Sequence, residues 1–152
     1  MPSPYTGGCL CGTVRYVLKG EPVTFYACHC TDCQRRTGTA FALSMVVNRN
    51  SFELLQGNPV FYTVKVADGR TKTGHVCPAC STRLWGEPAK APDFVIIQPG
   101  TLDDTSWLRP VAHIWTRSAQ PWFQFPKGVA QFEMQPAPGE LAKLWQQSIP
   151  TS

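Results

Sequence analysis

The chain has 152 residues, enough for one domain of ordinary size, and we expect a single domain over residues 1–152. Only 16% of the residues are charged and there are 12 Gly and 14 Pro, a composition that excludes long helices and coiled coils. The formal net charge is +4, but the basic residues are scattered, so nucleic-acid binding gains little support. The N-terminus carries no secretory signal pattern and no apolar run approaches the roughly 20 residues of a membrane span, so we expect a cytoplasmic protein without a membrane partner.

Short segments rich in Val, Ile, Phe, Tyr and Thr recur along the chain and are bounded by turn residues. They predict a mainly β fold of short antiparallel sheets. The pair Asp68-Gly69 between two of these segments predicts a hairpin turn, because Gly tolerates the positive φ that such a turn requires. The predicted strands are Thr13–Leu18, Val23–Cys28, Ala40–Val47, Phe52–Leu55, Val60–Val66, Thr71–Val76, Phe94–Gln98 and Val111–Thr116.

Two helices are predicted against this β background. The first is short: Thr31 and Gln34 have the spacing of a capping box at a helix start, and Gly38 suits its end. The second lies near the C-terminus, where apolar residues recur at helical spacing after Gly139 and predict an amphipathic helix packed on a sheet. Its apolar positions are Leu141, Leu144, Trp145 and Ile149.

The cysteines are the most informative feature of the sequence. There are seven, an odd number, and they occur in three tight clusters instead of being spread along the chain as a disulfide framework would be. This distribution favours metal binding. The clusters are Cys9 and Cys11, then Cys28, Cys30 and Cys33, then Cys77 and Cys80.

A four-cysteine zinc site is predicted from the first and last clusters. Cys9 and Cys11 are two residues apart, so in an extended strand they face the same side and can share one ion. Cys77 and Cys80 form a knuckle with two intervening residues, and the Ser81-Thr82 segment after it can supply backbone donors to the sulfurs. The alternative is a set of buried free thiols.

The middle cluster, Cys28, Cys30 and Cys33, then offers only three sulfurs to a second zinc. Three protein ligands leave one coordination position open, which is typical of a catalytic zinc, and three thiolates make that zinc prefer a soft fourth ligand such as a substrate sulfur. Other arrangements remain open. Cys30 and Cys33 could form a zinc ribbon with Cys77 and Cys80, although residues 34–76 intervene, or they could be a thioredoxin-like redox pair, although the surrounding βαβ pattern is absent.

The three histidines and two neighbouring arginines need separate interpretation. His75 could complete a metal site, but for His29, His75 and His113 alike a structural hydrogen bond is favoured over ligation. Arg35 and Arg36 directly follow the middle cluster, where a guanidinium can bind a substrate carboxylate. The alternative for either arginine is a solvated helix position.

Four stretches of the sequence carry a family resemblance: GGCLCGTVRY (7–16), CHCTDCQRRTG (28–38), CPACSTRLW (77–85) and GTLDDTSWLRPVAHIW (100–115). They resemble the glutathione-dependent formaldehyde-activating enzyme family, which also contains centromere protein V. One departure is Ser81, where the family usually has Gly. The resemblance implies a β-tent zinc fold, with a structural zinc on Cys9, Cys11, Cys77 and Cys80 and a catalytic zinc on Cys28, Cys30 and Cys33.

The family name implies condensation of glutathione with formaldehyde to S-(hydroxymethyl)glutathione, formally the reverse of a carbon–sulfur lyase reaction. We therefore expect a zinc-dependent carbon–sulfur lyase with two zinc ions per chain, glutathione as co-substrate, an aldehyde or thiol adduct as the other small molecule, and Arg35 or Arg36 on a carboxylate. Family membership alone does not fix the substrate. Two other functions stay open: a non-catalytic zinc module that binds a protein partner, and a chromatin or nucleic-acid binder, which the dispersed basic residues disfavour.

Overall fold

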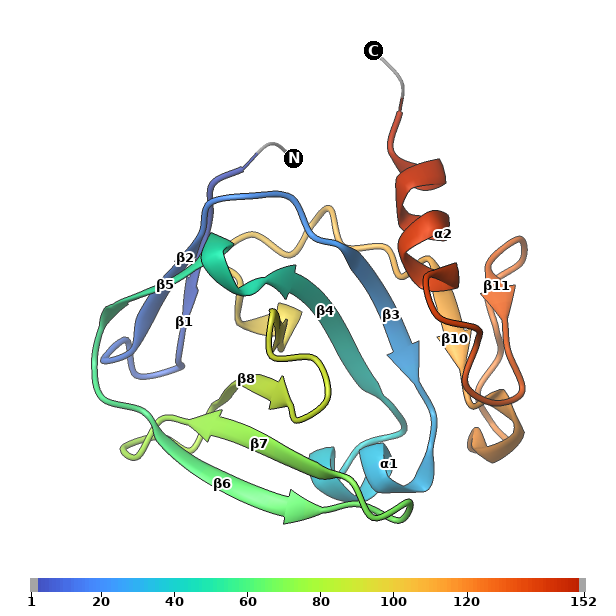
Figure 1. The fold of residues 1–152 in the computed structure, drawn as a ribbon, viewed down its shortest axis with the longest axis horizontal. Coiled ribbons are helices and arrows are strands. Elements are labelled where there is room, and N and C mark those ends of the chain that lie inside the picture. Colours follow the sequence, from blue (N-terminus) through green and yellow to red (C-terminus); the bar gives the residue numbers. More distant parts are fainter. Residues whose placement is uncertain (1–2, 151–152) are drawn as a thin grey trace. The chain divides into compact units, whose positions relative to one another are not determined.

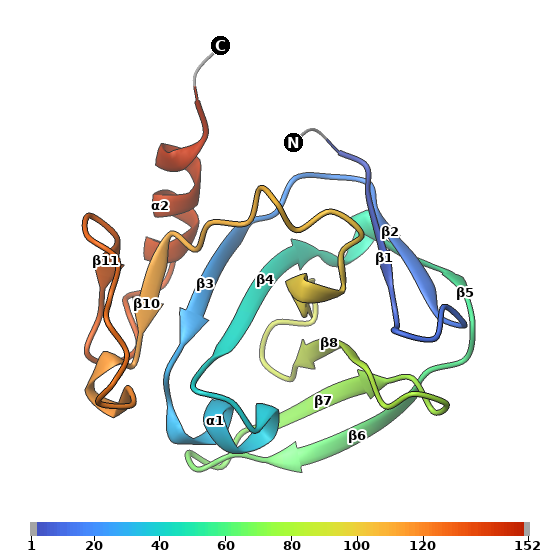
Figure 2. The ribbon, with the colours of Figure 1, turned by 180° about the vertical axis from the view of Figure 1, so that it is seen from behind.

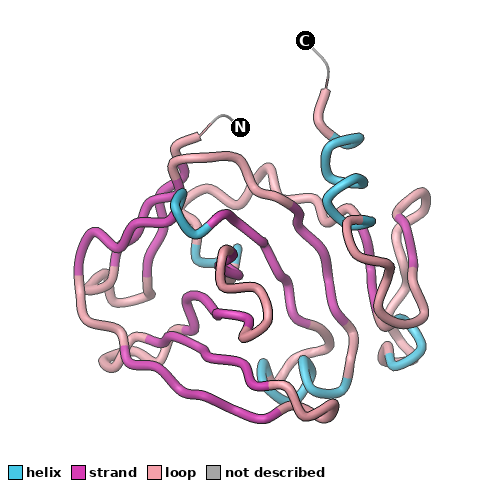
Figure 3. Tube along the Cα trace, viewed as in Figure 1, coloured by secondary structure: helices cyan, strands magenta, loops and turns pink. Residues whose placement is uncertain are grey.

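The computed structural model describes residues 3–150, which form two compact units whose sequences interleave. Of the described residues, the first unit comprises 3–22 and 45–108, and the second comprises 23–44 and 109–150. Among the described residues the chain forms 11 strands and two α-helices, the second of them near the C-terminus, so the predicted mainly β fold is confirmed (Figures 1 and 3). The single domain expected over residues 1–152 stays a prediction.

Short strands dominate the chain from one end to the other. The strands are β1 (Tyr5–Gly8), β2 (Arg15–Leu18), β3 (Thr24–Cys28), β4 (Ala42–Asn48), β5 (Phe52–Gln56), β6 (Val60–Lys65), β7 (Thr71–Val76), β8 (Arg83–Pro88), β9 (Phe94–Ile97), β10 (Ala112–Ile114) and β11 (Ala130–Gln131). The α-helices are α1 (Thr31–Thr37) and α2 (Glu140–Ser148), and the 3-10 helices are η1 (Arg49–Ser51), η2 (Pro99–Thr101) and η3 (Thr116–Ser118). None of the helices within residues 3–150 is long and apolar enough to span a bilayer.

The first unit contains two antiparallel arrangements of strands. One is a three-stranded sheet in the order β1-β2-β5. The other runs in the order β4-β9-β8-β7-β6, with β4 taking part through Met45–Asn48. In both ribbon views β6 lies at the outer edge, next to β7 (Figures 1 and 2).

The hairpin predicted at the Asp-Gly pair joins β6 to β7, and its loop has three residues. Val66 donates its N–H to the carbonyl oxygen of Arg70 at 2.9 Å, and Gly69 donates to the carbonyl oxygen of Val66 at 2.9 Å. Gly69 has φ +87°, which an L-residue adopts only with strain. Asp68 accepts the N–H of Arg70 at 3.0 Å. This is the pattern of a tight turn followed by a glycine bulge, which fixes the register of the hairpin.

Aromatic rings build the centre of the first unit. The ring of Phe52 lies between Tyr16, with ring centroids 5.7 Å apart, and Trp85, with ring centroids 4.7 Å apart. Burying one large apolar side chain stabilises a fold by about 1.5–3 kcal/mol, and the aliphatic residues around these rings contribute in the same way. The aliphatic side chains with no exposed area are Leu18, Met45, Val47, Leu84, Val95 and Ile97.

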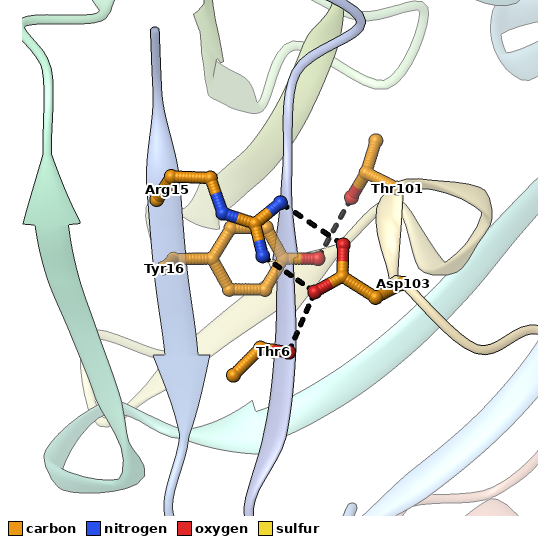
Figure 4. Close-up of polar contacts among 5 residues, drawn as sticks. All are labelled: Thr6, Arg15, Tyr16, Thr101 and Asp103. Carbon is orange, nitrogen blue, oxygen red and sulfur yellow. Dashed lines mark hydrogen bonds and ion pairs between the residues drawn. The ribbon is translucent and has the colours of Figure 1, made fainter. Parts of the chain in front are cut away.

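A polar network ties β1 and β2 to the end of η2 and the segment after it (Figure 4). Arg15 donates to both carboxylate oxygens of Asp103, at 2.9 and 2.5 Å, and the Thr6 hydroxyl donates to Asp103 at 2.6 Å. These donors hold the pKa of the Asp103 carboxyl below its usual range. The hydroxyl of Tyr16 hydrogen-bonds that of Thr101 at 2.7 Å. The network fixes the two strand ends between which the N-terminal cysteines lie.

The second unit contains a mixed sheet, because β10 runs parallel to both β3 and β11. The helix α2 packs on β3 (Figure 1), where Thr24 donates its hydroxyl to the carbonyl oxygen of Leu141 at 2.8 Å and Trp145 is buried. As predicted, the helix begins after Gly139, which has φ +84°. It ends one residue before Ile149, which is exposed, so the predicted apolar face is one residue too long.

The predicted strands are all present, each end within two residues of its expected position. Three strands were not predicted: β1, β8 and β11. Their sequences lack strong strand signals, since β1 contains two glycines, β8 contains a glycine and a proline, and β11 is two residues long. Pairing with neighbouring strands therefore holds these segments in the extended conformation, which their own residue preferences do not favour.

Candidate metal centres

Four cysteines from distant parts of the first unit come together. The sulfurs of Cys9, Cys11, Cys77 and Cys80 all lie within 4.8 Å of one another. The Sγ atoms of Cys9 and Cys11 are 3.6 Å apart, and those of Cys11 and Cys77 are 3.8 Å apart. A tetrahedral zinc with Zn–S bonds of about 2.3 Å places its sulfurs about 3.8 Å apart, whereas a disulfide needs about 2.05 Å. The group therefore fits a zinc ion and not a pair of disulfides.

Glycine geometry shapes the loop that carries Cys9. The Cys9 N–H bonds the carbonyl oxygen of Val14 at 3.1 Å, and the Gly12 N–H bonds the carbonyl oxygen of Cys9 at 3.1 Å. Gly12 has φ +80°, and a Cβ atom on Gly8 would lie 2.3 Å from the carbonyl oxygen of Val14. The glycines flanking the CLC motif are therefore required for the loop to close on itself.

The knuckle after β7 closes in a similar way. Ser81 donates its N–H to the carbonyl oxygen of Cys77 at 2.9 Å, and Cys77 donates to the carbonyl oxygen of Thr82 at 3.0 Å. Ser81 has φ +66°, a left-handed conformation that glycine adopts without strain. This is the position at which the sequence departs from the family pattern, and the serine keeps the backbone shape that a glycine would take.

Hydroxyl and amide groups favour the ionised form of two of the four sulfurs, those of Cys80 and Cys9, whereas the pKa of Cys11 is raised. Thr82 donates to Cys80 from its hydroxyl, 3.1 Å from the sulfur, and from its backbone, and these hydrogen bonds lower the pKa of Cys80 to about 5. Burial opposes ionisation of Cys9, but the N–H of Val14 and the hydroxyl of Thr13 outweigh it and lower the pKa of Cys9 to about 7. The sequence predicts backbone donors after Cys80, but it does not indicate that the Thr13 hydroxyl bonds the Cys9 sulfur.

The three middle cysteines form a second group, within the second unit. Their sulfurs also lie within 4.8 Å of one another, with Cys28 at the end of β3, Cys30 directly before α1 and Cys33 in its first turn. Cys28 and Cys33 are buried and Cys30 is half-buried. The neighbouring thiols Cys30 and Cys33, together with burial, raise the pKa of Cys28. Three sulfurs at this spacing cannot all ionise without a cation, so the donor set fits a zinc ion.

The start of α1 differs from the predicted capping box. Cys30, not Thr31, is the N-cap residue, and its sulfur accepts the N–H of Cys33 at 3.3 Å. Gln34 donates its side-chain amide to the carbonyl oxygens of His29 at 2.8 Å and Ser118 at 2.9 Å instead of capping the helix. The chain must turn at Cys30 to bring the three sulfurs together, so the helix begins one residue earlier than a hydroxyl cap would place it. The predicted end at Gly38, with φ +67°, is present.

The histidines bind one another or pack on aromatic rings. His29 has no exposed area and its Nε2 lies 2.9 Å from Nδ1 of His113, inside a cluster of Phe41, Phe123 and Phe125. Burial, with a smaller contribution from His113, lowers the pKa of His29 to about 4, so the pair is neutral at pH 7. In the first unit, the ring of His75 stacks on the Trp85 ring with centroids 4.5 Å apart. Among residues 3–150 the two groups that could hold a metal ion contain cysteine only.

A cleft of about 720 Å³ follows α1 in the second unit. Arg35 lines it and Arg36 does not, which distinguishes the two arginines that the sequence leaves equivalent. The side-chain amide of Gln120, from the segment after η3, lies 3.4 Å from the side-chain oxygen of Gln34 and closes one side. No local sequence signal marked this contact. The lining residues are Thr31, Gln34, Arg35, Gly38, Thr39, Ala40 and Gln120.

Comparison with known proteins supports the resemblance found in the sequence. Residues 4–118 match the model of a family described as "Glutathione-dependent formaldehyde-activating enzyme". A crystal structure of a Rhodobacter sphaeroides protein is similar, with a TM-score of 0.53 and 16% sequence identity over 84% of this chain and 98% of that chain. At that identity the likeness concerns the fold alone. No curated protein matches the chain in sequence.

Proposed function

The chain belongs to the glutathione-dependent formaldehyde-activating enzyme family, and on this premise we propose that it is a zinc-dependent enzyme of the carbon–sulfur lyase class, which acts on the adduct of glutathione, or a similar thiol, with formaldehyde. The observation that carries the proposal is the division of seven cysteines into groups of four and three sulfurs. Four thiolates complete a tetrahedral site, whereas three leave a position for a substrate. We assign a structural zinc to Cys9, Cys11, Cys77 and Cys80, and a catalytic zinc to Cys28, Cys30 and Cys33.

The proposed reaction forms or breaks one carbon–sulfur bond. In the forward direction the thiol sulfur attacks the carbon of formaldehyde, the C=O bond becomes a single bond, and the proton lost by the thiol ends on the oxygen. The reverse direction returns the proton to sulfur and releases the aldehyde. A zinc ion held by three thiolates would lower the pKa of a substrate thiol bound beside it. The protein's own contribution is then to bind the rest of the thiol and orient it.

The cleft residue Arg35 is our assignment for the substrate carboxylate. The cleft begins at Thr31, directly after Cys30. At about 1.5 Å of helix rise per residue, Arg35 lies about 7.5 Å along α1 from Cys30, and an extended tripeptide spans about 10 Å. A tripeptide thiol whose sulfur lies at the three-cysteine group can therefore reach the guanidinium with a carboxylate. Thr39 and Gln120 offer further polar contacts along the same cleft.

Cobalt replacement of zinc tests the proposal, because the visible spectrum of Co²⁺ responds to the number of bound sulfurs. We expect titration with glutathione to change the spectrum and titration with S-methylglutathione, which has no free thiol, to leave it unchanged. Arg35→Ala should weaken glutathione binding by about 1–3 kcal/mol, the usual range for a charged hydrogen bond, while metal content stays the same. Arg36→Ala is the matched control and should have the smaller effect.

A rate measurement completes the test, because thiols add to formaldehyde without an enzyme. Exchange of carbon-13 formaldehyde between free and adduct forms, followed by NMR with the uncatalysed rate subtracted, should be faster with enzyme and slower with Cys30→Ser. A cobalt spectrum that does not respond to glutathione would refute the enzyme assignment and favour the alternative, a non-catalytic zinc module. The cytoplasmic location stays part of the proposal, since seven cysteines that form no disulfide suit a reducing compartment.

A further inference from the structure

Exposed apolar side chains are concentrated on β5 and β6. Among the described residues ten large apolar side chains are exposed, and six of them fall between positions 54 and 64. Isolated exposed apolar residues are ordinary, so the concentration of six on two consecutive strands singles out this part of the chain. The six are Leu54, Leu55, Val60, Phe61, Tyr62 and Val64.

The strand β6 is an edge without the usual protection. All six of its residues, Val60–Lys65, are exposed, and Phe61 and Tyr62 expose 65% and 62% of their surface. Monomeric proteins block such edges with a central charge, a proline, a bulge or a covering element. β6 has no proline, its only charge is the terminal Lys65, and its register with β7 is regular. The edge is therefore available to another strand.

The hairpin determines which backbone groups of β6 face outward. Val66 donates to Arg70, so these two residues form a hydrogen-bonded pair. The register of β6 with β7 continues from this pair, and hydrogen-bonded pairs alternate along an antiparallel ladder. The N–H and C=O groups of Val60, Tyr62 and Val64 therefore point to β7. Those of Phe61, Thr63 and Lys65 point away from β7, to the free edge.

We propose that this edge binds a second copy of the chain, with the two β6 strands antiparallel about a two-fold axis at Thr63. In this register Thr63 pairs with Thr63 of the second copy, and Phe61 pairs with Lys65 of the second copy. The pair at the axis and the two Phe61–Lys65 pairs on either side of it each exchange two backbone hydrogen bonds. Every outward N–H and C=O group of β6 is then satisfied. A two-fold contact of one strand with itself is self-complementary and closes at a dimer.

The side chains agree with this register. The single positive charge, Lys65, meets the Phe61 ring of the second copy, where a cation interacts favourably with the aromatic face. The two Lys65 residues are four positions from their counterparts, about 13 Å along the strand, so they repel each other little at physiological salt. On the other face Tyr62 meets Val64 of the second copy, an aromatic and β-branched pair of the kind that stabilises sheets.

The neighbouring register on the Tyr62 side fits less well. Centring the two-fold axis on Tyr62 would pair Lys65 with Pro59, which lies before the strand and has no N–H to donate. The two Tyr62 side chains would then face each other and Phe61 would meet Thr63, leaving the lysine without an aromatic partner. The register centred on Thr63 is therefore the one we assign.

The first test measures oligomeric state and amide exchange on zinc-loaded protein. Sedimentation equilibrium should show a reversible monomer–dimer equilibrium. Hydrogen exchange followed by NMR should show the amides of Phe61, Thr63 and Lys65 protected at high protein concentration and exchanging fast at low concentration. The amides of Tyr62 and Val64, bonded to β7, should be protected at both. A monomer at all concentrations, or a dimer in which the three outward amides stay unprotected, overturns the proposal.

Two pairs of matched variants test the axis and the register. Thr63→Pro removes an outward N–H and should give a monomer, whereas Thr63→Val keeps the N–H and should stay dimeric. Phe61→Lys places like charges opposite each other at two sites, whereas Phe61→Glu places a carboxylate opposite Lys65 at the same sites. We expect dimerisation to be about tenfold weaker or more in Phe61→Lys than in Phe61→Glu. Equal dimerisation of these two variants, both lacking the ring, would overturn the register even if Thr63→Pro failed to fold.

Discussion

Replacing Ser81 by glycine should stabilise the first unit. Ser81 lies between Cys80 and Thr82 in the knuckle and has φ +66°. An L-residue in this left-handed conformation costs roughly 1–2 kcal/mol, which glycine avoids. Glycine in turn loses more backbone freedom on folding, at a cost of about 0.4–1 kcal/mol. The difference predicts a net gain of about 0.5–1 kcal/mol for Ser81→Gly.

Thermal unfolding of zinc-loaded protein measures this gain. For a chain of this size 1 kcal/mol corresponds to about 2–4 °C, so Tm should rise by about 1–4 °C. Ser81→Ala is the control, because alanine lacks the hydroxyl but keeps the cost of the left-handed conformation, and it should not gain stability. The exposed position of Ser81 keeps packing changes small in both variants.

The stability difference between the two variants is decisive. If Ser81→Gly is no more stable than Ser81→Ala, the left-handed conformation is not a source of strain and the reasoning fails. If both gain equally, the serine hydroxyl and not the backbone accounts for the difference. Release of zinc to a chelator gives a second readout, since a less strained knuckle should release its ion more slowly.

Metal analysis of reconstituted protein should give two zinc ions per chain. Cys80→Ser should lose one ion together with most of the thermal stability, because a structural zinc contributes folding free energy. Cys30→Ser should lose the other ion and keep most of the stability. Gly7→Ala would place a Cβ atom 2.6 Å from the Tyr16 ring and should cost about 1–3 kcal/mol in denaturant unfolding, while Gly100→Ala, with no atom within 4 Å of its added Cβ, should be close to neutral. Burial raises the pKa of Tyr16 to about 12 from its ordinary value of 10, so its contribution to stability is present below pH 10 and is lost as the pH rises through 12. An alkaline ultraviolet titration of Tyr16→Phe should show one fewer late-ionising phenol than the parent protein.

The local parts of the cysteine groups were predictable from spacing, whereas the pairing of the first cluster with the last followed from counting sulfurs against the four ligands of a structural zinc. Cys77 and Cys80 must converge in any tight turn, and Cys28, Cys30 and Cys33 fall within six residues. Chain geometry limits the partners that such short segments can offer one ion. The hairpin of β6 and β7 was predictable for the same reason, since Gly69 carries its own conformational signal.

Contacts between distant residues other than the cysteines could not be predicted from the sequence. The bond between His29 and His113 and the bond from Gln34 to the Ser118 carbonyl each join residues 84 positions apart, and no local pattern pairs them. The cap at Cys30 was missed because a hydroxyl is the commoner cap, and only the convergence of the three sulfurs moves the helix start. The strand β6 was predicted, but its exposure was not, because an apolar strand gives the same pattern whether or not another element covers it.

The two cysteine groups share one construction and differ in their surroundings. In each, a strand end delivers a sulfur and a tight turn delivers the next, as at Cys77 and Cys28. Around the first group, hydroxyl and amide donors lower the pKa of Cys80 to about 5 and that of Cys9 to about 7, so the protein itself favours two of the four thiolates, while the pKa of Cys11 is raised. Around the second, neighbouring thiols and burial raise the pKa of Cys28, so ionisation there depends on the cation. Four sulfurs, two of them already favoured as thiolates by the fold, suit a permanent structural ion, whereas three sulfurs that depend on their ion suit one whose remaining position is taken by a substrate thiol.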